Sequence, residues 1–432
     1  MDITAILIVI GFLFLLSIGP PVAAAMGFMA FIGMILGPGL HKGIVASSTE
    51  VYYFLTSYAL VPLPLFALMG NLFAASGVST DLFEAAHAWL SRVRGGLAMV
   101  TIGTCTAFAT LSGSSISATA TLGPVLIPEM QRAKYDQKLT VGTIGAAGGL
   151  AHLIPPSAIA VFYAALVEVS AGKQLFAGLV PGLILAICYA VVVFVWSSIN
   201  PRLAPPGAPV SWKVRLVSLK KVLAPAIIAL VVLVAIYTGM ATVTEAAAVG
   251  AFAGLVLCLI KRVRLAVYRS ALMDTVTAIG FILLISAAAK MFSWILSYYM
   301  LPQQLATFLT EAHWTPLVTL IAIQILYIML GMFIDTISML LLTIPVLFPL
   351  ITAMGYDLIW FGVLFMINVE MALISPPFGF HLFIIKGIAP QVPFGDIVKS
   401  CLVFAMADLL VLGLVIAFPG LAMWLPNLMS GG

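Results

Sequence analysis

One short stretch of the sequence is rich in hydroxyl groups, although the chain around it is apolar. Residues 111–119 read L-S-G-S-S-I-S-A-T. Lipid supplies no hydrogen-bond partner, so non-helical chain at membrane depth must be buried in protein or line a wet cavity. Neutral oxygens from hydroxyls and freed carbonyls suit a hard monovalent cation such as Na⁺. We therefore predict an ion site at Ser112, Gly113, Ser114 and Ser115; packing of small residues between helices is the alternative.

A second stretch, residues 331–338, reads G-M-F-I-D-T-I-S and carries one acidic residue. An ionisable side chain inside a membrane span is costly and is a functional candidate by default. Asp335 is thus predicted to be an ion ligand, together with Thr336 and Ser338. The alternative is that its carboxylate only accepts hydrogen bonds from the backbone around it.

Two Pro-Pro pairs interrupt the apolar runs that follow these stretches, as I-P-P-S at 154–157 and I-S-P-P at 374–377. Proline removes a backbone donor and stops a helix at the preceding residue, so each pair predicts a broken helix with freed carbonyls. We expect Pro155 to complete the first ion site and Ser375 the second. Polar residues near the tips and breaks are predicted to contact a substrate: Ser117, Thr119, His152, Ser157, Glu370 and His381. For the two histidines, a role as hydrogen-bonded polar neighbours is the favoured alternative. Glu370 could instead orient the loop at the second break or pair with a lysine.

The composition of the chain indicates a polytopic α-helical membrane protein. Of its 432 residues 63% are hydrophobic and only 8% are charged, against about 25% charged in soluble domains. The mean hydropathy is +1.21. The net charge of +4 lies in short loops, which indicates membrane orientation rather than nucleic-acid binding. The four cysteines are scattered through apolar segments and fit neither a disulfide framework nor a metal site.

An internal repeat organises the chain around these motifs. Pro124, Pro128 and the pair at 155–156 recur as Pro345, Pro349 and the pair at 376–377, and the Tyr-Asp dipeptide at 135–136 recurs at 356–357. All these matches have one and the same offset, which is not expected by chance. We predict two re-entrant hairpins at about 97–127 and 315–350, and two broken helices at about 139–170 and 358–388. The remaining apolar spans are predicted at about 3–18, 22–38, 51–77, 174–199, 222–240, 243–260, 272–300 and 396–425, with a linker at 200–221.

Basic residues orient the two halves. The loop at 131–138 carries three basic residues, whereas its counterpart at 352–359 carries none. The positive-inside rule therefore assigns the first loop to the cytoplasm and the second to the outside. Each half then has five full spans and one hairpin, and an odd number of spans inverts the second half. Inverted repeats with broken helices at mid-membrane are the architecture of secondary transporters.

No enzyme constellation is found in the sequence. It contains no HExxH, no P-loop and no GxSxG motif. The chain is therefore predicted not to be an enzyme, and an ion gradient is the expected energy source.

The number and order of several short motifs resemble one transporter family over nearly the whole chain. The motifs are S-G-S-S (112–115), I-P-E-M (127–130), L-I-P-P-S (153–157), G-M-F-I-D (331–335), I-W-F-G (359–362), N-V-E (368–370), L-I-S-P-P (373–377) and K-G-I-A-P (386–390). The resemblance is to the large membrane subunit, the M subunit, of tripartite ATP-independent periplasmic (TRAP) transporters.

This resemblance implies an elevator-type secondary transporter of the ion transporter superfamily, in the bacterial inner membrane. It implies Na⁺ coupling, with the ions at the two junctions of hairpin and broken helix. It also implies two partners, a small membrane subunit of four helices and a soluble periplasmic substrate-binding protein. Some members fuse the small subunit to the large one; this chain has no such N-terminal extension, so a separate subunit is expected. A small carboxylate is the expected substrate.

The motifs depart from the family pattern near the breaks. Ala151 and His152 stand where Gly and an aliphatic residue are usual, and Ser375, Phe378 and His381 stand where Thr, Val and Asn are usual. Serine keeps the hydroxyl of threonine, so these departures put the substrate in doubt more than the ion sites.

We expect a scaffold from residues 1–95 and 200–310, and a moving transport domain from 96–199 and 311–432. Na⁺ would order the two hairpin tips and complete a substrate site between them. The rival hypotheses are a stand-alone carrier without a binding protein, an ion channel and, least supported, a membrane enzyme.

Overall fold

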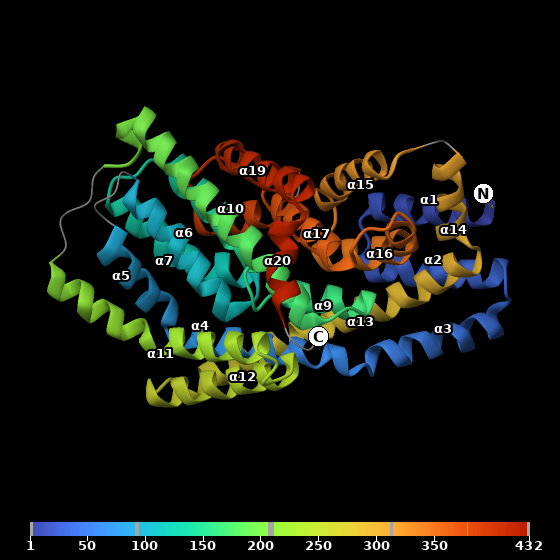
Figure 1. The fold of residues 1–432 in the computed structure, drawn as a ribbon, viewed down its shortest axis with the longest axis horizontal. Coiled ribbons are helices and arrows are strands. Elements are labelled where there is room, and N and C mark those ends of the chain that lie inside the picture. The colour runs from blue at the N-terminus through green and yellow to red at the C-terminus, as the bar shows by residue number, and fades with distance from the viewer. Residues whose placement is uncertain (1–2, 91–94, 206–210, 312–313, 378, 430–432) are drawn as a thin grey trace.

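The chain is helical throughout the computed structural model, which describes residues 3–90, 95–205, 211–311, 314–377 and 379–429. No strand occurs in these ranges. Seven helices in the described ranges are long and apolar enough to cross a membrane. This is the all-α membrane architecture that the composition predicts (Figure 1).

Twenty α-helices and three short 3-10 helices are formed by the described residues. The first half contains α1 (Ile3–Ile18), α2 (Val22–Leu36), α3 (Leu40–Leu55), η1 (Tyr58–Leu60), α4 (Pro62–Ala75), α5 (Val78–Leu90), α6 (Gly96–Ser112), α7 (Ser115–Arg132), α8 (Gln137–Gly149), η2 (Leu150–His152), α9 (Ala158–Val167) and α10 (Ala171–Ile199). After η3 (Pro201–Leu203), the second half contains α11 (Trp212–Tyr237), α12 (Val243–Ile260), α13 (Leu265–Tyr298), α14 (Leu301–Glu311), α15 (Pro316–Gly331), α16 (Thr336–Ala353), α17 (Leu358–Leu373), α18 (Phe380–Ile388), α19 (Phe394–Ala417) and α20 (Gly420–Leu428).

The helix boundaries repeat at the offset found in the sequence. Helices α7 and α16 are related by this offset at both their first and their last residues, and α8 and α17 are related by it at their first residues. Helices α2 and α12, far from the motifs, also begin at positions related by the same offset. The repeat therefore extends over the whole fold. Each half contains one helical hairpin, α6–α7 or α15–α16, and one broken helix, α8–α9 or α17–α18.

Equivalent side chains begin equivalent helices in the two halves. Ser114 accepts a hydrogen bond from the amide three residues on and begins α7, and Asp335 accepts from the amides two and three residues on and begins α16. Asp136 and Asp357 begin α8 and α17 in the same way. Short polar side chains satisfy amides that have no partner inside a helix, which is why these residue types mark helix starts.

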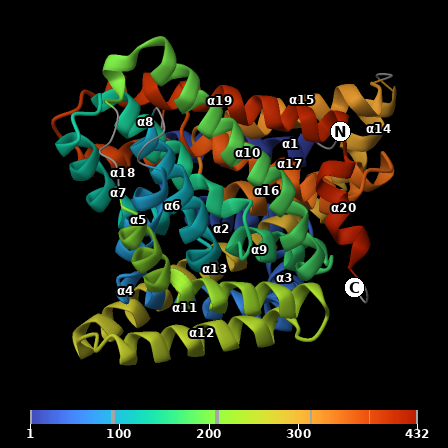
Figure 2. The same cartoon turned by 60° about the vertical axis from the view of Figure 1, so that its left-hand side comes forward.

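The helices pack in two groups that touch through α4, α5 and α13. In one group, α13 contacts α2, α3 and α4, α4 contacts α12, and α12 contacts α11. Helices α3, α11, α12 and α13 of this group extend along the lower edge of the molecule in Figures 1 and 2. In the other group, α8 contacts α6, α7 and α19, while α17 contacts α10, α15 and α19. Both hairpins and both broken helices belong to this second group. Its contacts with the first run from α13 to α16, from α4 to α6 and α9, and through α5, which packs on both α6 and α11.

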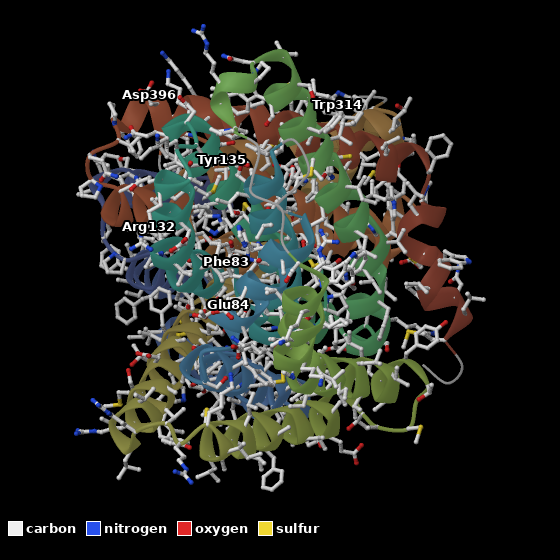
Figure 3. The ribbon with its side chains drawn as sticks, turned by 90° about the vertical axis from the view of Figure 1, so that its left-hand side faces the viewer. Phe83, Glu84, Arg132, Tyr135, Trp314 and Asp396 are labelled. Carbon is white, nitrogen blue, oxygen red and sulfur yellow. The ribbon has the colours of Figure 1, made fainter. Side chains whose placement is uncertain are left out.

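Polar contacts tie the open end of hairpin one, away from its tip. The Tyr135 hydroxyl accepts a hydrogen bond from the Leu97 amide at 3.1 Å, which joins the end of α7 to the start of α6. Lys138 lies 3.4 Å from Asp396 at the start of α19. Figure 3 shows Arg132, Tyr135 and Asp396 at this side of the molecule. The hairpin is thus held at its base, where the chain meets solvent, as well as at its tip.

Several elements differ from the predicted spans, and three of the helices concerned, α3, α5 and α14, are amphipathic. The span predicted at 51–77 is two helices, α3 and α4, and α3 begins at Leu40. The polar segment that follows it forms the helix α5, and a further short helix, α14, precedes hairpin two. The predicted linker at 200–221 is shorter, because α11 already begins at Trp212, where the Ser211 side chain accepts from the Val214 amide. Polar residues on one helix face lower the local hydropathy, so a search for apolar runs does not find such helices.

Candidate functional site

The tip of hairpin one lies directly against the break between α8 and α9. The Gly113 carbonyl accepts a hydrogen bond from the Ala158 amide at 3.2 Å. Gly113 has a left-handed φ of +59°, and a Cβ atom there would lie 2.8 Å from the Pro156 carbonyl oxygen. Only glycine fits both the backbone conformation and this close approach. The structure therefore joins the two parts of the first predicted ion site, the serine-rich tip and the Pro155–Pro156 break.

The serine side chains at this tip have different partners. Ser112 is buried, and its hydroxyl lies 3.5 Å from the Ser114 carbonyl oxygen. The Ser114 hydroxyl accepts from the Ser117 amide at 3.3 Å, as the helix cap. The Ser115 hydroxyl lies 3.0 Å from Nε2 of His152. Hydroxyl and carbonyl oxygens thus lie together at one turn of the chain. These are the types of oxygen atom that the sequence analysis proposes as ion ligands.

The Asp335 carboxylate at the tip of hairpin two faces the first turn of α16. It accepts from the Ile337 and Ser338 amides, each at 3.1 Å, and from the Ser338 hydroxyl at 2.5 Å. These are the hydrogen bonds of the structural alternative considered for Asp335. A carboxylate has about four acceptor positions, so three bonds leave room for a further ligand.

The second break lies beside hairpin two and shares a cavity with its tip. A Cβ atom on Gly331 would lie 2.4 Å from Cβ of Ala372, so the end of α15 and the end of α17 are in close contact. The Ser375 hydroxyl donates to the Met371 carbonyl at 2.7 Å and stays within its own turn. The Pro376–Pro377 bond is cis, as is Pro155–Pro156. Phe378 lies outside the described residues.

One cavity connects both hairpin tips. Its volume is about 360 Å³. Residues 113–116 and 335–337 line it from the two tips, and His152 lines it from η2. The opposite wall is apolar and includes Ala278, Phe281 and Ile282 of α13. Both predicted ion sites therefore border a single cavity between the two groups of helices. Its lining is mostly apolar, and its polar side chains are Ser114, Ser115, His152, Asp335 and Thr336.

Four helices begin at this cavity. Ser115, Ala158, Thr336 and Phe380 are the first residues of α7, α9, α16 and α18, and all four line the cavity. The N-terminus of a helix carries partial positive charge, which favours an anion. At α16 the Asp335 carboxylate already accepts from two of the amides. The cavity lining contains no lysine or arginine from the described part of the chain. Its attraction for an anion would therefore come from the N-termini of α7, α9 and α18.

The comparisons with known proteins give the family. The family model "Tripartite ATP-independent periplasmic transporter, DctM component" matches residues 9–421. The chain belongs to this family. It is 34% identical over 372 residues, 86% of each chain, to the C4-dicarboxylate TRAP transporter large permease protein DctM of Pseudomonas aeruginosa. It is 29% identical to the sialic acid TRAP transporter large permease protein SiaM of Vibrio cholerae, over 98% of each chain.

Solved structures of more distant proteins share the fold of this TRAP transporter component. MtrF of Neisseria gonorrhoeae superposes with a TM-score of 0.63 at 13% identity, over 90% of this chain and 85% of that one. The YdaH transporter of Alcanivorax borkumensis superposes with a TM-score of 0.63 at 15% identity, over 96% and 99%. The family membership and the apolar helices identify the chain as a secondary transporter subunit and a multi-pass protein of the bacterial inner membrane, and not an enzyme.

The predicted substrate residues of this TRAP component lie at different depths. His152 lines the cavity between the tips. Thr119, Ser157, Glu370 and His381 are buried outside the lining of this cavity, and Ser117 is half-buried outside it. Thr119 donates to the Ser115 carbonyl at 3.1 Å, Ser157 caps α9, and a His381 ring nitrogen lies 2.7 Å from the Gly145 carbonyl. In this conformation the four buried residues support the cavity wall from behind.

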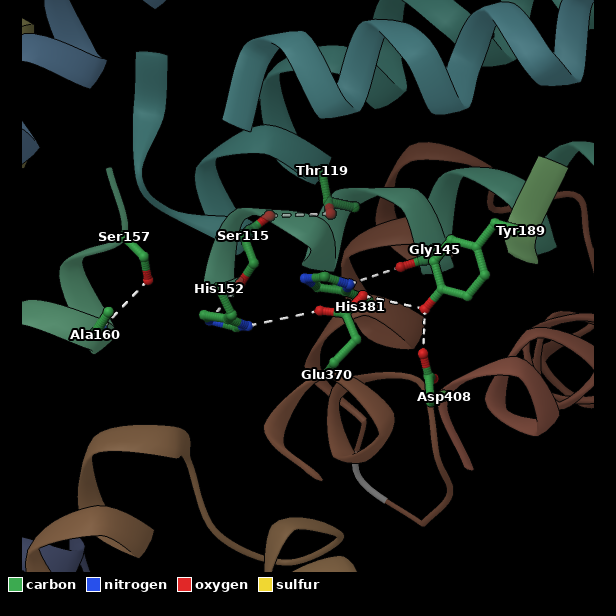
Figure 4. A network of polar contacts seen from close by, with 10 residues as sticks. All are labelled: Ser115, Thr119, Gly145, His152, Ser157, Ala160, Tyr189, Glu370, His381 and Asp408. Atoms are coloured by element: carbon green, nitrogen blue, oxygen red, sulfur yellow. Dashed lines mark hydrogen bonds and ion pairs between the residues drawn. The ribbon is translucent and has the colours of Figure 1, made fainter. Parts of the chain in front are cut away.

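A buried polar chain runs from the cavity into the transporter interior (Figure 4). His152, which contacts Ser115, has its other ring nitrogen 3.8 Å from Glu370. Glu370 in turn lies 3.3 Å from the Tyr189 hydroxyl, which lies 2.5 Å from Asp408. The sequence reasoning missed Tyr189 and Asp408. Asp408 is an acidic residue inside an apolar span, so the rule that selected Asp335 would also have found it.

Proposed function

We propose that this TRAP component imports a small organic acid together with Na⁺, and that a periplasmic binding protein delivers the substrate. A separate small membrane subunit of four helices would complete the complex. The observation that supports this proposal best is the single cavity between the two hairpin tips, at which four helix N-termini meet. A carboxylate fits such a site, because helix N-termini favour negative charge.

The coupling ions bind at the two tips in this proposal. At hairpin one, Ser112, Gly113, Ser114 and Ser115 supply oxygens together with the break at Pro155. The hydrogen bond between Gly113 and the first turn of α9 supports this assignment, because it brings the oxygens of the tip and of the break together.

At hairpin two, Asp335, Thr336 and Ser338 supply oxygens together with Ser375. The acceptor position that remains free on the Asp335 carboxylate supports this second assignment. No group of three or more His, Cys, Asp or Glu side chains suited to a metal ion occurs among the described residues. Neutral oxygens would therefore have to supply most of the ligands at both tips.

The transport step in this proposal is the movement of one group of helices against the other. Residues 96–199 and 311–432 would move, and residues 1–95 and 200–310 would stay as the scaffold. The apolar wall that α13 presents to the tips supports this division, because a polar cavity without its cargo is costly to carry past hydrocarbon. Bound ion and substrate would lower that cost and so couple the two movements.

The substrate class rests on the relatives as well as on the cavity. The names of relatives give C4-dicarboxylate, sialic acid and ectoine as transported compounds. The first two of these are acids by name. A C4-dicarboxylate is therefore the first probe to use, with sialic acid and ectoine as the second and third.

Reconstituted uptake tests the proposal. Proteoliposomes would contain this chain with the small membrane subunit, and the periplasmic binding protein would be added outside with radiolabelled succinate. We expect uptake with an inward Na⁺ gradient and none when choline replaces Na⁺. Uptake by this chain alone would instead favour the stand-alone carrier. Currents far above the turnover of a carrier would favour a channel. Uptake that is equal in Na⁺ and choline would contradict Na⁺ coupling.

A further inference from the structure

Two carboxylic acids share one hydroxyl group in the interior of the protein. Glu370 on α17 and Asp408 on α19 are both 0% exposed. The Tyr189 hydroxyl, on α10, lies 2.5 Å from Oδ1 of Asp408 and 3.3 Å from Oε1 of Glu370. Figure 4 shows the tyrosine ring pointing its hydroxyl between the two acids. Three helices from both repeats thus converge on one small polar cluster.

The number of hydrogen atoms in this cluster does not match two ionised acids. A phenol has one hydrogen and donates to one acceptor, while an ionised carboxylate only accepts. If the Tyr189 hydroxyl donates to Asp408, Glu370 faces the lone pairs of the same oxygen. A proton on Glu370 turns that repulsive contact into a second hydrogen bond. The observed geometry is therefore satisfied by two acids that hold one proton between them.

Among the described residues, no neighbouring cation compensates the two acids. Within those ranges, no lysine or arginine nitrogen lies within 4.0 Å of either carboxylate. The other buried or half-buried titratable groups without a full charge on the surrounding elements are His152 on η2, His381 on α18, Cys188 on α10, Cys401 on α19, Cys105 on α6, Tyr163 on α9 and Tyr327 on α15. The other charged residues of these elements are Lys138 on α8, Lys173 on α10, Lys386 on α18, and Asp396 and Lys399 on α19. Two unpaired negative charges would be very costly in this environment, because burial and mutual repulsion both favour the protonated acid.

A buried nitrogen without a partner points at the acid pair from the cavity side. Nδ1 of His152 makes no hydrogen bond with any described residue, and it lies 3.8 Å from Oε2 of Glu370, which is also unpartnered among these residues. His152 itself is 5% exposed and lines the cavity. Space for the Glu370 carboxylate is made by Gly149, where a Cβ atom would lie 2.2 Å from both of its oxygens. The fold thus leaves room for this acid beside His152, which is the residue between the acid pair and the cavity.

We propose that Glu370, Asp408 and Tyr189 form a buried proton-binding site that takes up and releases one proton, one side chain away from the substrate cavity. The site differs from the predicted Na⁺ sites, since it contains none of their residues. All three side chains belong to the helices that the proposed function assigns to the transport domain. The proton would then travel with that domain, a step that rests on the proposed function. The proton site itself does not.

Infrared spectroscopy of the full chain in lipid vesicles tests the site without substrate or partner subunits. The carbonyl stretch of a protonated carboxylic acid is separate from the amide bands, and the spectra would be compared between about pH 5 and about pH 9. We expect one protonated-acid band that is lost as the pH rises. Glu370→Gln and Asp408→Asn should each abolish this band. Asp274→Asn should leave it, because Asp274 is an exposed acid on α13.

Tyr189→Phe is a second, more conservative variant that tests the site even if the two acid variants fail to fold. It keeps the ring, which packs edge-on against Phe404 at 5.5 Å, and removes only the hydroxyl. The protonated-acid band should persist at a shifted frequency, because the acid pair has lost the Tyr189 hydroxyl as its hydrogen-bond partner. A band that never changes with pH would mean a permanent structural proton and would overturn the proposal. A band that saturating NaCl removes at constant pH, but choline chloride does not, would assign the acid pair to a cation instead and would also overturn it.

Discussion

Gly149 and Glu370 face each other across the contact between the end of α8 and α17, and they are equivalent positions of the two repeats. A side chain at the first would occupy the place of the carboxylate at the second. The repeats have therefore diverged in a complementary way at this point. One half has no side chain at this position, and the other half has a carboxylate in the space.

Substituting Gly149 by alanine tests this relationship. Gly149 has ordinary helical dihedral angles, so alanine alone would favour the helix by about 1 kcal/mol. The overlap of the added methyl group with the Glu370 carboxylate should outweigh this gain. We therefore expect the free energy of unfolding to fall by about 1–3 kcal/mol, as it does when a core is overpacked. The measurement is the thermal unfolding midpoint of the purified chain. Gly413→Ala in α19 is the matched control, because no atom lies within 4 Å of the Cβ it would add. Equal midpoints for the two variants would show that the contact is not tight.

Substituting Gly113 by alanine should disrupt the docking of hairpin one on the first break. Gly113 and Gly77 both have left-handed dihedral angles, with φ of +59° and +75°. Alanine costs about 1–2 kcal/mol in that conformation at either position. Only at Gly113 would the added Cβ also meet Pro156, whereas nothing lies within 4 Å at Gly77. Gly113→Ala should therefore lower the unfolding midpoint further than Gly77→Ala and should weaken Na⁺-dependent stabilisation, which Gly77→Ala should leave unchanged.

Substituting Asp335 by asparagine should weaken Na⁺ binding while keeping the helix cap. Asparagine caps a helix about as well as aspartate, so the fold should persist, whereas the negative charge is lost. Unfolding would be followed in NaCl and in choline chloride. Na⁺ at about 100 times its Kd would stabilise the wild type by about 2.7 kcal/mol. That Na⁺-specific gain should shrink in Asp335→Asn.

Asp357→Asn is the matched control for this prediction. Asp357 caps α17 with the same two amide contacts but lies at the other end of the broken helix, away from the cavity. It should keep the full response to Na⁺. The same response to Na⁺ in all three proteins would leave Asp335 with the structural role alone.

Much of the fold could be predicted because the residues that interrupt its helices form short motifs in the sequence. Small polar motifs within apolar runs, proline pairs and the constant offset between the repeats located both hairpins and both broken helices within a few positions. The amphipathic helices α5 and α14 were missed, because polar residues such as Asp81 and Glu84 hide them from a search for apolar runs. Hydrogen bonds between residues that are far apart in the chain could not be predicted from the sequence. That Tyr189 bridges Glu370 and Asp408 depends on three helices meeting, and no local pattern encodes it.

The opposite orientation of the repeats can be tested with one cysteine in each. Arg132 ends α7 and Ala353 ends α16, so they are equivalent, and both are accessible at helix ends. The basic loop after Arg132 predicts a cytoplasmic position, and inversion predicts that Ala353 lies outside. In intact cells, a membrane-impermeant thiol reagent should therefore label Ala353→Cys and spare Arg132→Cys. Inside-out vesicles should show the reverse.

The native cysteines give little background in this labelling experiment. Cys105, Cys258 and Cys401 are buried, and Cys188 is half-buried in α10. Loss of Arg132 removes only its pairing with Glu129, an exposed contact of 2.5 Å, and exposed pairs contribute at most about 1 kcal/mol. The variant should therefore fold normally. Labelling of both cysteines from the same side would contradict the inverted repeat, since a parallel repeat brings equivalent residues to one face.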